Sequence, residues 1–383
     1  GIARELESSA AHSIWVVNAY QVATLAMLLP LASLGDLIGY RRVYLAGMAL
    51  FALSSIGAML SSSLGMLIAA RAVQGLGAAG IMSVNSALVR LIYPRALLGR
   101  GMAINSIVVA TSAVAGPSVA AAILSVASWP WLFALNLPLG ALTLVLGRRA
   151  LPVNPGAPAA GARFSLVDAA LNVLMFLLIF IGAERLGVHA EPQQGSPLVA
   201  AGLLAAGLVV GVFYLRRQRA LSVPLFPVDL LRIPVFSLSM GASISAFCGQ
   251  MLAYIALPFL LLDTYGRSPF QAGWLITAWP LAIVCVAPIA GRLIGRYPDG
   301  LLGGMGMAVF AAGLLLLSIL PADPSNADVV WRMALCGAGF GLFQSPNNHT
   351  IVATPPLSRS GASRRRMPMF AFMRGSLAYS AHM

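Results

Sequence analysis

The sequence predicts an all-α polytopic membrane protein. Hydrophobic residues make up 59% of its 383 residues and charged residues only 9%, whereas soluble domains carry about 25% charged residues. Apolar runs of about 20 residues recur along the chain, which is the length that a helix needs to cross the hydrocarbon core of a bilayer. The runs do not alternate polar and apolar residues, as the strands of a membrane barrel would. Helices are therefore the predicted spanning elements.

The apolar runs predict eleven spans, most of them joined by short connections. The longest connections are 148–165, which is rich in Pro, Gly and Ala, and 216–234. The predicted spans are 14–34, 43–61, 66–90, 101–126, 130–147, 166–185, 197–215, 235–262, 271–291, 302–320 and 329–352.

The distribution of arginine predicts how the bundle is oriented. If successive connections lie on alternate sides, 19 of the 24 basic residues, all of them arginine, fall on one side. The arginine-rich side of a membrane protein is cytoplasmic, so the first residues are expected outside the cell. This asymmetry also accounts for the net charge of +13 without a nucleic-acid partner.

The octet GDLIGYRR, residues 35–42, places three charges between two apolar runs. We expect a cytoplasmic loop of about eight residues there. One interpretation is a tight turn flanked by arginines that set the orientation. The other is an ion-pair clamp between Asp36 and an arginine, which forms and breaks as the helices move.

Two features of the first half recur in the second. GRLIGR at 291–296 repeats the pattern G-x-L-I-G of 35–39, 256 residues later. The segment that begins at Arg71 is echoed at Arg332, where Gly75 and Gly77 correspond to Gly337 and Gly339 at an offset of 262. Parallel repeats of this kind predict two structurally related halves, an architecture that membrane transporters use.

The sequence argues against several kinds of catalytic and cofactor-binding sites. GLGAAG at 75–80 matches the glycine pattern of dinucleotide sites, but it lies inside a helical run and no acid follows about 20 residues later. Small residues at this spacing favour close helix approach instead. The cysteines and histidines are scattered, and no phosphate-binding loop or nucleophile motif occurs. We therefore predict no enzyme, no metal and no cofactor.

Arg71 is the most informative charged residue because it lies inside a predicted span. A charged arginine near the bilayer centre costs about 2.5–3.5 kcal/mol. Helical periodicity puts Gln74 and Asn85 on the same face as Arg71, which predicts a polar surface lining a cavity. The open alternative is that Arg71 extends to the membrane surface.

The predicted span 101–126 contains a proline and a row of small residues. Pro117 removes a backbone donor and is expected to bend the helix. Ser112, Gly116 and Ala120 recur every four residues and predict a smooth face for close packing.

Scattered polar and aromatic residues inside the spans could line a cavity for an amphipathic ligand. For each of them, hydrogen bonding between helices is the open alternative. The candidates are Asn18, Tyr20, Gln21, Asn85, Gln250, Tyr254, Trp279, Gln344 and Asn347.

Four segments resemble motifs of one membrane family: LASLGDLIGYRR, LIAARAVQGLGAA at 67–79, VAGPSVAA, and WPWLFALNLPLG at 129–140. Over about residues 1–362 the chain resembles the drug:proton antiporters of the major facilitator superfamily with fourteen helices (QacA/EmrB type). The resemblance implies efflux of lipophilic or cationic drugs by alternating access. It implies a gating role for Asp36, Gly39, Arg41 and Arg42, proton coupling through Arg71 and Gln74, and an antiporter motif at Gly116 and Pro117.

The resemblance also implies that about 11 of the 14 helices are present, without helices one, thirteen and fourteen. We expect an N-terminal half lacking its first helix at 1–150 and two extra central helices with cytoplasmic linkers at 151–234. A partial C-terminal half at 235–362 and an atypical, out-of-frame tail at 363–383 would follow. The expected partners are the lipid bilayer of the bacterial plasma membrane, protons and small amphipathic or cationic substrates, bound by a monomer. The sequence leaves open a metabolite uptake symporter and a non-transporting truncated remnant.

Overall fold

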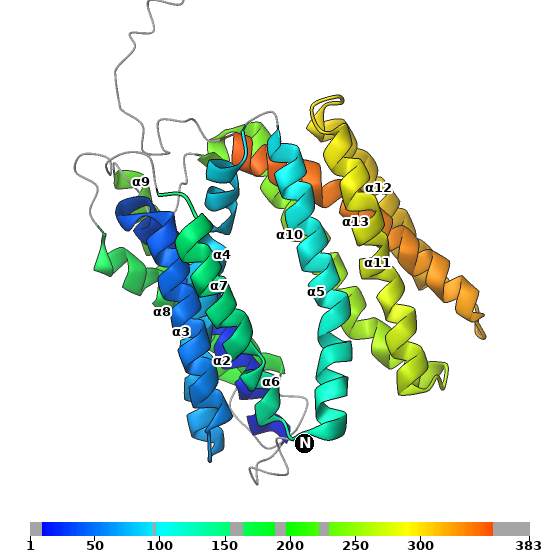
Figure 1. Ribbon diagram of the computed structural model, residues 1–383, viewed down its shortest axis with the longest axis horizontal. Coiled ribbons are helices and arrows are strands. Elements are labelled where there is room, and N and C mark those ends of the chain that lie inside the picture. Colours follow the sequence, from blue (N-terminus) through cyan, green and yellow to red (C-terminus); the bar gives the residue numbers. More distant parts are fainter. Residues whose placement is uncertain (1–9, 95–96, 154–163, 188–196, 222–229, 355–383) are drawn as a thin grey trace, which may run out of the picture.

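The computed structural model describes residues 10–94, 97–153, 164–187, 197–221 and 230–354, and its regular elements there are all helices (Figure 1). The predicted tail at 363–383 lies outside the described residues. The helices are α2 (Ala10–Ile38), α3 (Tyr40–Met59), α4 (Leu64–Ile92), α5 (Leu98–Val126), α6 (Pro130–Ala134), α7 (Asn136–Ala150), α8 (Leu166–Gly187), α9 (Pro197–Ala220), η3 (Leu230–Arg232), α10 (Pro234–Phe259), η4 (Leu260–Thr264), α11 (Pro269–Leu293), α12 (Asp299–Ser318) and α13 (Asn326–Ala353).

Each of the eleven predicted spans coincides with a helix, although 130–147 is divided at Leu135 into α6 and α7. Among the described residues, nine helical stretches are long and apolar enough to cross a membrane. The two other predicted spans, α5 and α13, are helices of 29 and 28 residues that fall outside this group. Polar residues in α13, among them Arg332 and Asn347, interrupt its apolar character.

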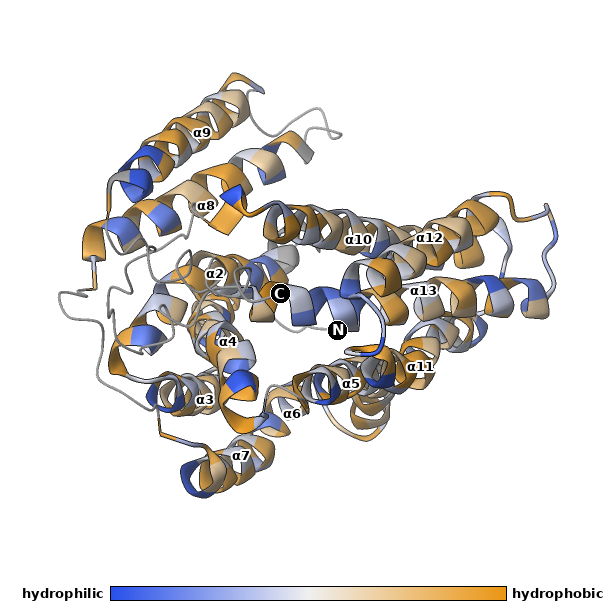
Figure 2. Ribbon diagram, turned by 90° about the horizontal axis from the view of Figure 1, so that it is seen from above, coloured by the Kyte–Doolittle hydropathy of each residue, from blue (hydrophilic) through white to orange (hydrophobic). Residues whose placement is uncertain are grey.

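Many large apolar side chains of the bundle are exposed, and hydrophobic residues occur along all the labelled helices (Figure 2). Leu208, Leu238 and Leu315 are 63%, 73% and 68% exposed. Contiguous exposed apolar surface is unfavourable in water but is what lipid tails require. The described helices are therefore suited to a bilayer.

The predicted eight-residue loop over 35–42 is wrong. α2 continues to Ile38 and α3 begins at Tyr40, so that only Gly39 separates the two helices. Gly39 has a φ of 105°, a conformation that redirects the chain within one residue and that a side chain disfavours. Its repeat counterpart Gly295, which follows α11, also has a positive φ, of 85°. We call the end of the bundle that holds Gly39 and Gly295 the Arg-rich end; it is the upper end in Figure 1.

Replacing Gly39 with alanine should lower the free energy of unfolding by about 1–2 kcal/mol, because the added Cβ is strained at positive φ. The measurement is the apparent melting temperature of the purified protein in detergent. Gly300→Ala is the matched control, since Gly300 is helical and a Cβ there meets nothing within 4 Å. Equal melting temperatures for the two variants would contradict the prediction.

The sequence repeat corresponds to a repeat in packing. A Cβ added to Gly75 of α4 would lie 2.4 Å from the carbonyl oxygen of Tyr20 on α2. A Cβ added to Gly337 of α13 would lie 2.1 Å from the carbonyl oxygen of Trp279 on α11. Only glycine allows these backbones to touch. The pair α2 and α4 therefore packs as the pair α11 and α13 does.

The second glycine of each motif makes the other equivalent contact. A Cβ on Gly77 would lie 2.6 Å from the backbone nitrogen of Phe51 on α3, and one on Gly339 would lie 2.3 Å from that of Phe310 on α12. Phe51 and Phe310 are 259 residues apart, as are Tyr20 and Trp279. The triplet of α2, α3 and α4 thus has its structural counterpart in α11, α12 and α13.

Helix α5 connects the two triplets. It packs mainly against α11 and α13 and makes few contacts with α4 and α6 (Figures 1 and 2). At the Arg-rich end, a Cβ on Gly291 would lie 2.4 Å from the Cβ of Ala103, and one on Gly99 would lie 2.8 Å from Cγ2 of Ile294. The two halves of the chain therefore meet there through small and apolar residues.

Candidate functional site

Arg71 lies two turns inside α4, and two groups within the bundle hold its guanidinium. Its Nε donates a hydrogen bond to the carbonyl oxygen of Val16 on α2 at 3.0 Å. One terminal nitrogen donates to Oε1 of Gln74 at 2.6 Å. Gln74 follows one turn later on the same face of α4. This geometry favours a site inside the bundle over extension to the membrane surface.

Aromatic rings complete the surroundings of Arg71. The guanidinium carbon lies 4.3 Å from the ring centroid of Tyr20 and 5.8 Å from that of Phe133 on α6. A cation over an aromatic face gains about 0.5–2 kcal/mol, more when water is excluded. Within the described residues, the ion pairs do not include Arg71. In the part of the chain that the structure describes, the Arg71 site is therefore a cation held by dipoles and rings without a carboxylate.

Gln74 extends this site into a network that joins four helices. Its Nε2 donates to Oγ of Ser55 on α3 at 2.7 Å, and Asn136 of α7 donates to the same oxygen at 3.3 Å. Gln74 is fully buried, so both ends of its amide need partners. Thr24 of α2 also donates to the Gly75 carbonyl at 3.1 Å. We call Arg71, Gln74, Ser55 and Asn136 the Arg71 network.

The predicted polar face of α4 is divided between two places. Asn85 lies 14 residues after Arg71, about 21 Å along the helix axis. Its Nδ2 donates to Oδ1 of Asn105 on α5 at 3.0 Å. Asn85 therefore links α4 to α5 and does not belong to the Arg71 network. The sequence analysis missed Asn105, although a single amide inside an apolar run was an available signal.

The three candidates on α2 are not equivalent. Tyr20 contacts Arg71, as described above. Asn18 is half-buried and Gln21 is exposed, and neither is part of the Arg71 network. Of these three candidates, only Tyr20 contributes to the site.

The predicted ion-pair clamp at Asp36 is not formed. The carboxylate accepts a hydrogen bond from the hydroxyl of Tyr40 at 2.5 Å, and none of the ion pairs among the described residues includes Asp36. Arg41 instead donates to the backbone carbonyl of Arg148 at the end of α7, and Arg42 is exposed. Asp36 lies in the last turn of α2 and Tyr40 is the first residue of α3, so the hydrogen bond between them spans the junction at Gly39.

The counterpart of Arg71 in the second half, Arg332, is neutralised. One of its terminal nitrogens lies 3.5 Å from Oδ1 of Asp328, one turn earlier on α13, and the other donates to the Leu316 carbonyl at 3.1 Å. The repeated scaffold therefore carries a paired arginine in one half and, among the described residues, an unpaired one in the other.

The cavity candidates in the second half of the chain lie either in the hydrophobic core or between neighbouring helices. Trp279 is fully buried and packs with Tyr254, at 5.1 Å between ring centroids, in the main hydrophobic core. In the described structure this position gives Trp279 a packing role. Gln250 is 7% exposed and Gln344 is half-buried. Asn347 donates to Oγ of Ser243 on α10 at 2.6 Å.

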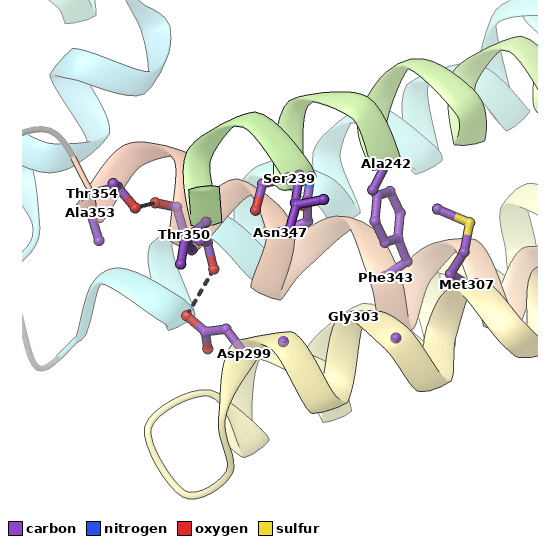
Figure 3. A pocket seen from close by; sticks show the side chains of 14 residues that line it. Ser239, Ala242, Asp299, Gly303, Met307, Phe343, Asn347, Thr350, Ala353 and Thr354 are labelled. Carbon is purple, nitrogen blue, oxygen red and sulfur yellow. Dashed lines mark hydrogen bonds between the residues drawn. The ribbon is translucent and has the colours of Figure 1, made fainter. Parts of the chain in front are cut away.

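A groove of about 720 Å³ lies between α10, α12 and α13 (Figure 3). Of the candidates, only Asn347 lines it. At one end of the groove Asp299, the first residue of α12, has its Oδ2 2.6 Å from Nδ1 of His349 and 3.3 Å from Oγ1 of Thr350. The sequence analysis missed this cluster because Asp299 and His349 are 50 residues apart in two different helices.

Helix α5 changes character along its length. Met102, Ala103, Ser106 and Ala110 are buried, whereas the described residues after Ala110 are exposed or half-buried. A Cβ on Gly116 would meet nothing within 4 Å. The predicted close-packing face through Ser112 and Gly116 is therefore wrong in the described structure. Pro117 continues the helix, and its side chain lies outside the described residues.

Comparisons with known proteins give the same fold. Residues 1–363 match the sequence profile described as Major Facilitator Superfamily. The structure is similar to that of the proton:xylose symporter XylE bound to 6-bromo-6-deoxy-D-glucose, with a TM-score of 0.59 at 13% identity. The match covers 91% of this chain and 73% of XylE.

Two relatives cover most of the chain. This chain is 53% identical over 362 residues to the "Uncharacterized transporter YebQ" of Escherichia coli strain K12, and the match covers 94% of this chain and 78% of the relative. It is 29% identical over 371 residues to the "Multidrug efflux pump LfrA" of Mycolicibacterium smegmatis, covering 94% of this chain and 71% of the pump.

Proposed function

Because this chain belongs to the Major Facilitator Superfamily and is a multi-pass membrane transporter of small solutes rather than an enzyme, we propose that it exports lipophilic or cationic drugs in exchange for protons. The direction and the substrate class rest on two supports. One is the similarity to the efflux pump LfrA, and the other is the resemblance of the segment around Gly116 and Pro117 to an antiporter motif.

The observation that carries the proposal is the Arg71 network. Proton coupling needs a charge in the membrane whose electrostatic partner changes with protonation. Arg71 supplies a cation without a carboxylate partner among the described residues, and Gln74 and Tyr20 fix its position. A proton-carrying group that approaches Arg71 would lose its proton more readily, since a nearby positive charge stabilises the ionised acid.

The contact between the halves supports alternating access. Gly99, Ala103 and Gly291 touch at the Arg-rich end, and none of them takes part in an ion pair among the described residues. Their separation breaks van der Waals contacts. In this proposal the segments 1–150 and 235–362 rock about this contact. Asp36, Gly39, Arg41 and Arg42 would act at the gate, and 151–234 would supply the two extra helices.

We place the substrate between the halves, against polar groups of both. Tyr20 and Asn85 would contribute from the first half, and Gln250 and Asn347 from the second. Amides and an aromatic ring among apolar side chains suit an amphipathic cation. We propose that one monomer in the bacterial plasma membrane performs the cycle.

Cells or proteoliposomes that contain the full chain should extrude ethidium when a proton gradient is present. Export is expected to stop within the time of gradient collapse when an uncoupler is added, because protons supply the driving force. The measurement is ethidium fluorescence over time, with vesicles lacking the protein as the control.

Three outcomes separate the alternatives. Gradient-dependent export supports the proposal. Proton-driven accumulation of a labelled metabolite without ethidium export would overturn it in favour of an uptake symporter. A folded, monodisperse protein that moves neither probe would identify a non-transporting remnant.

A further inference from the structure

Helix α2 contains a proline in the middle of its span, and this proline frees a backbone carbonyl. Pro30 has no N–H group, so the carbonyl of Ala26, four residues earlier, has no donor within the helix. Ala26 is 2% exposed and Pro30 is buried. Water does not reach the hydrocarbon region, where an unsatisfied carbonyl is costly. Another part of the protein must therefore supply the missing donor.

Helix α8 supplies it through one side chain. Nδ2 of Asn172 donates a hydrogen bond to the carbonyl oxygen of Ala26 at 2.7 Å, and Asn172 is fully buried. The two residues are 146 positions apart in the sequence. Figure 2 shows α8 beside α2, and the two helices are in contact. The bond thus joins the central helix pair to α2 at Pro30, where a proline inside a helix is expected to bend it.

The central pair holds Asn172 firmly. Asp168 lies one turn before Asn172 on the same face of α8, is 1% exposed, and has its Oδ1 2.7 Å from Nε of Arg217 on α9. Arg217 is 39% exposed, so only the carboxylate of this ion pair is buried, and the pair links α8 to α9. A Cβ on Gly182 would lie 2.9 Å from the backbone nitrogen of Leu204, which brings the two backbones close together.

Pro30 lies between two segments of the chain that the proposed function uses. Val16 and Tyr20, which contact Arg71, precede Pro30. Asp36 and Gly39, at the Arg-rich end, follow it. The angle at Pro30 therefore sets the direction of the segment at the Arg-rich end relative to the Arg71 network.

We propose that Asn172 is a positioning residue that holds the proline bend of α2 and thereby couples the α8–α9 pair to the position of Asp36 and Gly39. The amide replaces the hydrogen bond that Pro30 removes, and it fixes one angle among those that a proline-containing helix can adopt. The consequence for transport rests on the proposed function, whereas the coupling itself does not.

The test is a double-mutant cycle between Asn172→Leu and Pro30→Ala, read out as a distance across the bend. Spin labels at Val17 and Ile38, which are 50% and 43% exposed, lie about 31 Å apart along α2. The label sites are introduced as cysteines after alanine replaces Cys248, Cys285 and Cys336. Double electron–electron resonance gives the distance distribution, and the ethidium export rate is measured in parallel.

We expect Asn172→Leu to broaden the distance distribution and to slow export severalfold. In the Pro30→Ala background the same substitution should have less than half of these effects, because the introduced alanine restores an N–H donor for the Ala26 carbonyl. Pro288→Ala is the matched control. It removes a proline from α11, far from Asn172 in the sequence, so its effects should add to those of Asn172→Leu.

Additive effects of Asn172→Leu and Pro30→Ala would overturn the proposal, as would an unchanged distance distribution in Asn172→Leu. The distance does not depend on the transported substrate. A wild-type protein that fails to export ethidium, but shows the coupling in the distances, would overturn the proposed function and support the inference. Normal ethidium export together with additive effects of the two substitutions on the distance would support the proposed function and overturn the inference.

Discussion

Replacing Gly337 with alanine is expected to prevent correct packing of α11 against α13. The new Cβ would lie 2.1 Å from the carbonyl oxygen of Trp279 and 2.9 Å from the Cβ of Ala282. The nearest neighbour is backbone, so no side-chain rotation can relieve the contact. Overpacking costs about 1–3 kcal/mol when side chains can adjust, and this contact should cost at least the upper part of that range.

The measurement is the yield of monodisperse protein in size-exclusion chromatography, followed by the apparent melting temperature. Gly304→Ala is the matched control, since it changes a glycine of a neighbouring membrane helix where a Cβ meets nothing within 4 Å. The melting temperature of the control should equal or exceed that of the wild type, because alanine favours helix more than glycine does. If Gly337→Ala has the same melting temperature as the wild type, the close contact between α11 and α13 is incorrect.

Replacing Arg71 with lysine should abolish most proton-coupled export, even though the charge is retained. The guanidinium donates through Nε to Val16 and through a terminal nitrogen to Gln74, while it faces Tyr20. A lysine ammonium cannot reproduce this planar fork. Loss of one charge-assisted hydrogen bond is worth about 1.5–3 kcal/mol, which corresponds to a rate decrease of roughly 10- to 100-fold.

Export by Arg71→Lys should be compared with export by Arg332→Lys at equal amounts of protein and equal melting temperature. Arg332 occupies the equivalent position on α13 and is already neutralised by Asp328, so its replacement should affect export less. A wild-type rate for Arg71→Lys, or an equal loss in both variants, would remove Arg71 from the proton-coupling step.

Much of the fold was predictable because a bilayer imposes simple requirements. An apolar run of about 20 residues in lipid has to be helical, so the eleven predicted spans coincide with helices. The repeat was predictable because Gly75, Gly77, Gly337 and Gly339 stand where helix backbones touch, and no larger residue fits there. Arg71 was recognisable because a charge inside an apolar run requires an explanation.

The remainder depends on which helices are neighbours, and the sequence does not contain this information locally. Whether Trp279 faces a cavity or the core depends on the positions of Tyr254 and Phe310 in other helices. Asp299 and His349 meet only because α12 and α13 are antiparallel neighbours. The loop at 35–42 was predicted too long because charged residues suggest a connection, whereas at the membrane surface they also fit the last turn of a helix.

The difference between Arg71 and Arg332 has an electrostatic consequence for the order of events in a transport cycle. Leu67 occupies the position one turn before Arg71, where Asp328 precedes Arg332. Among the described residues, the two repeated helix triplets thus carry unequal net charge at equivalent positions. In a medium of low dielectric constant, uncompensated positive charge repels an incoming cation over many ångströms. An anion that docks beside Arg71 would lower that barrier, so its arrival and departure would determine when a positively charged cargo can enter the same half.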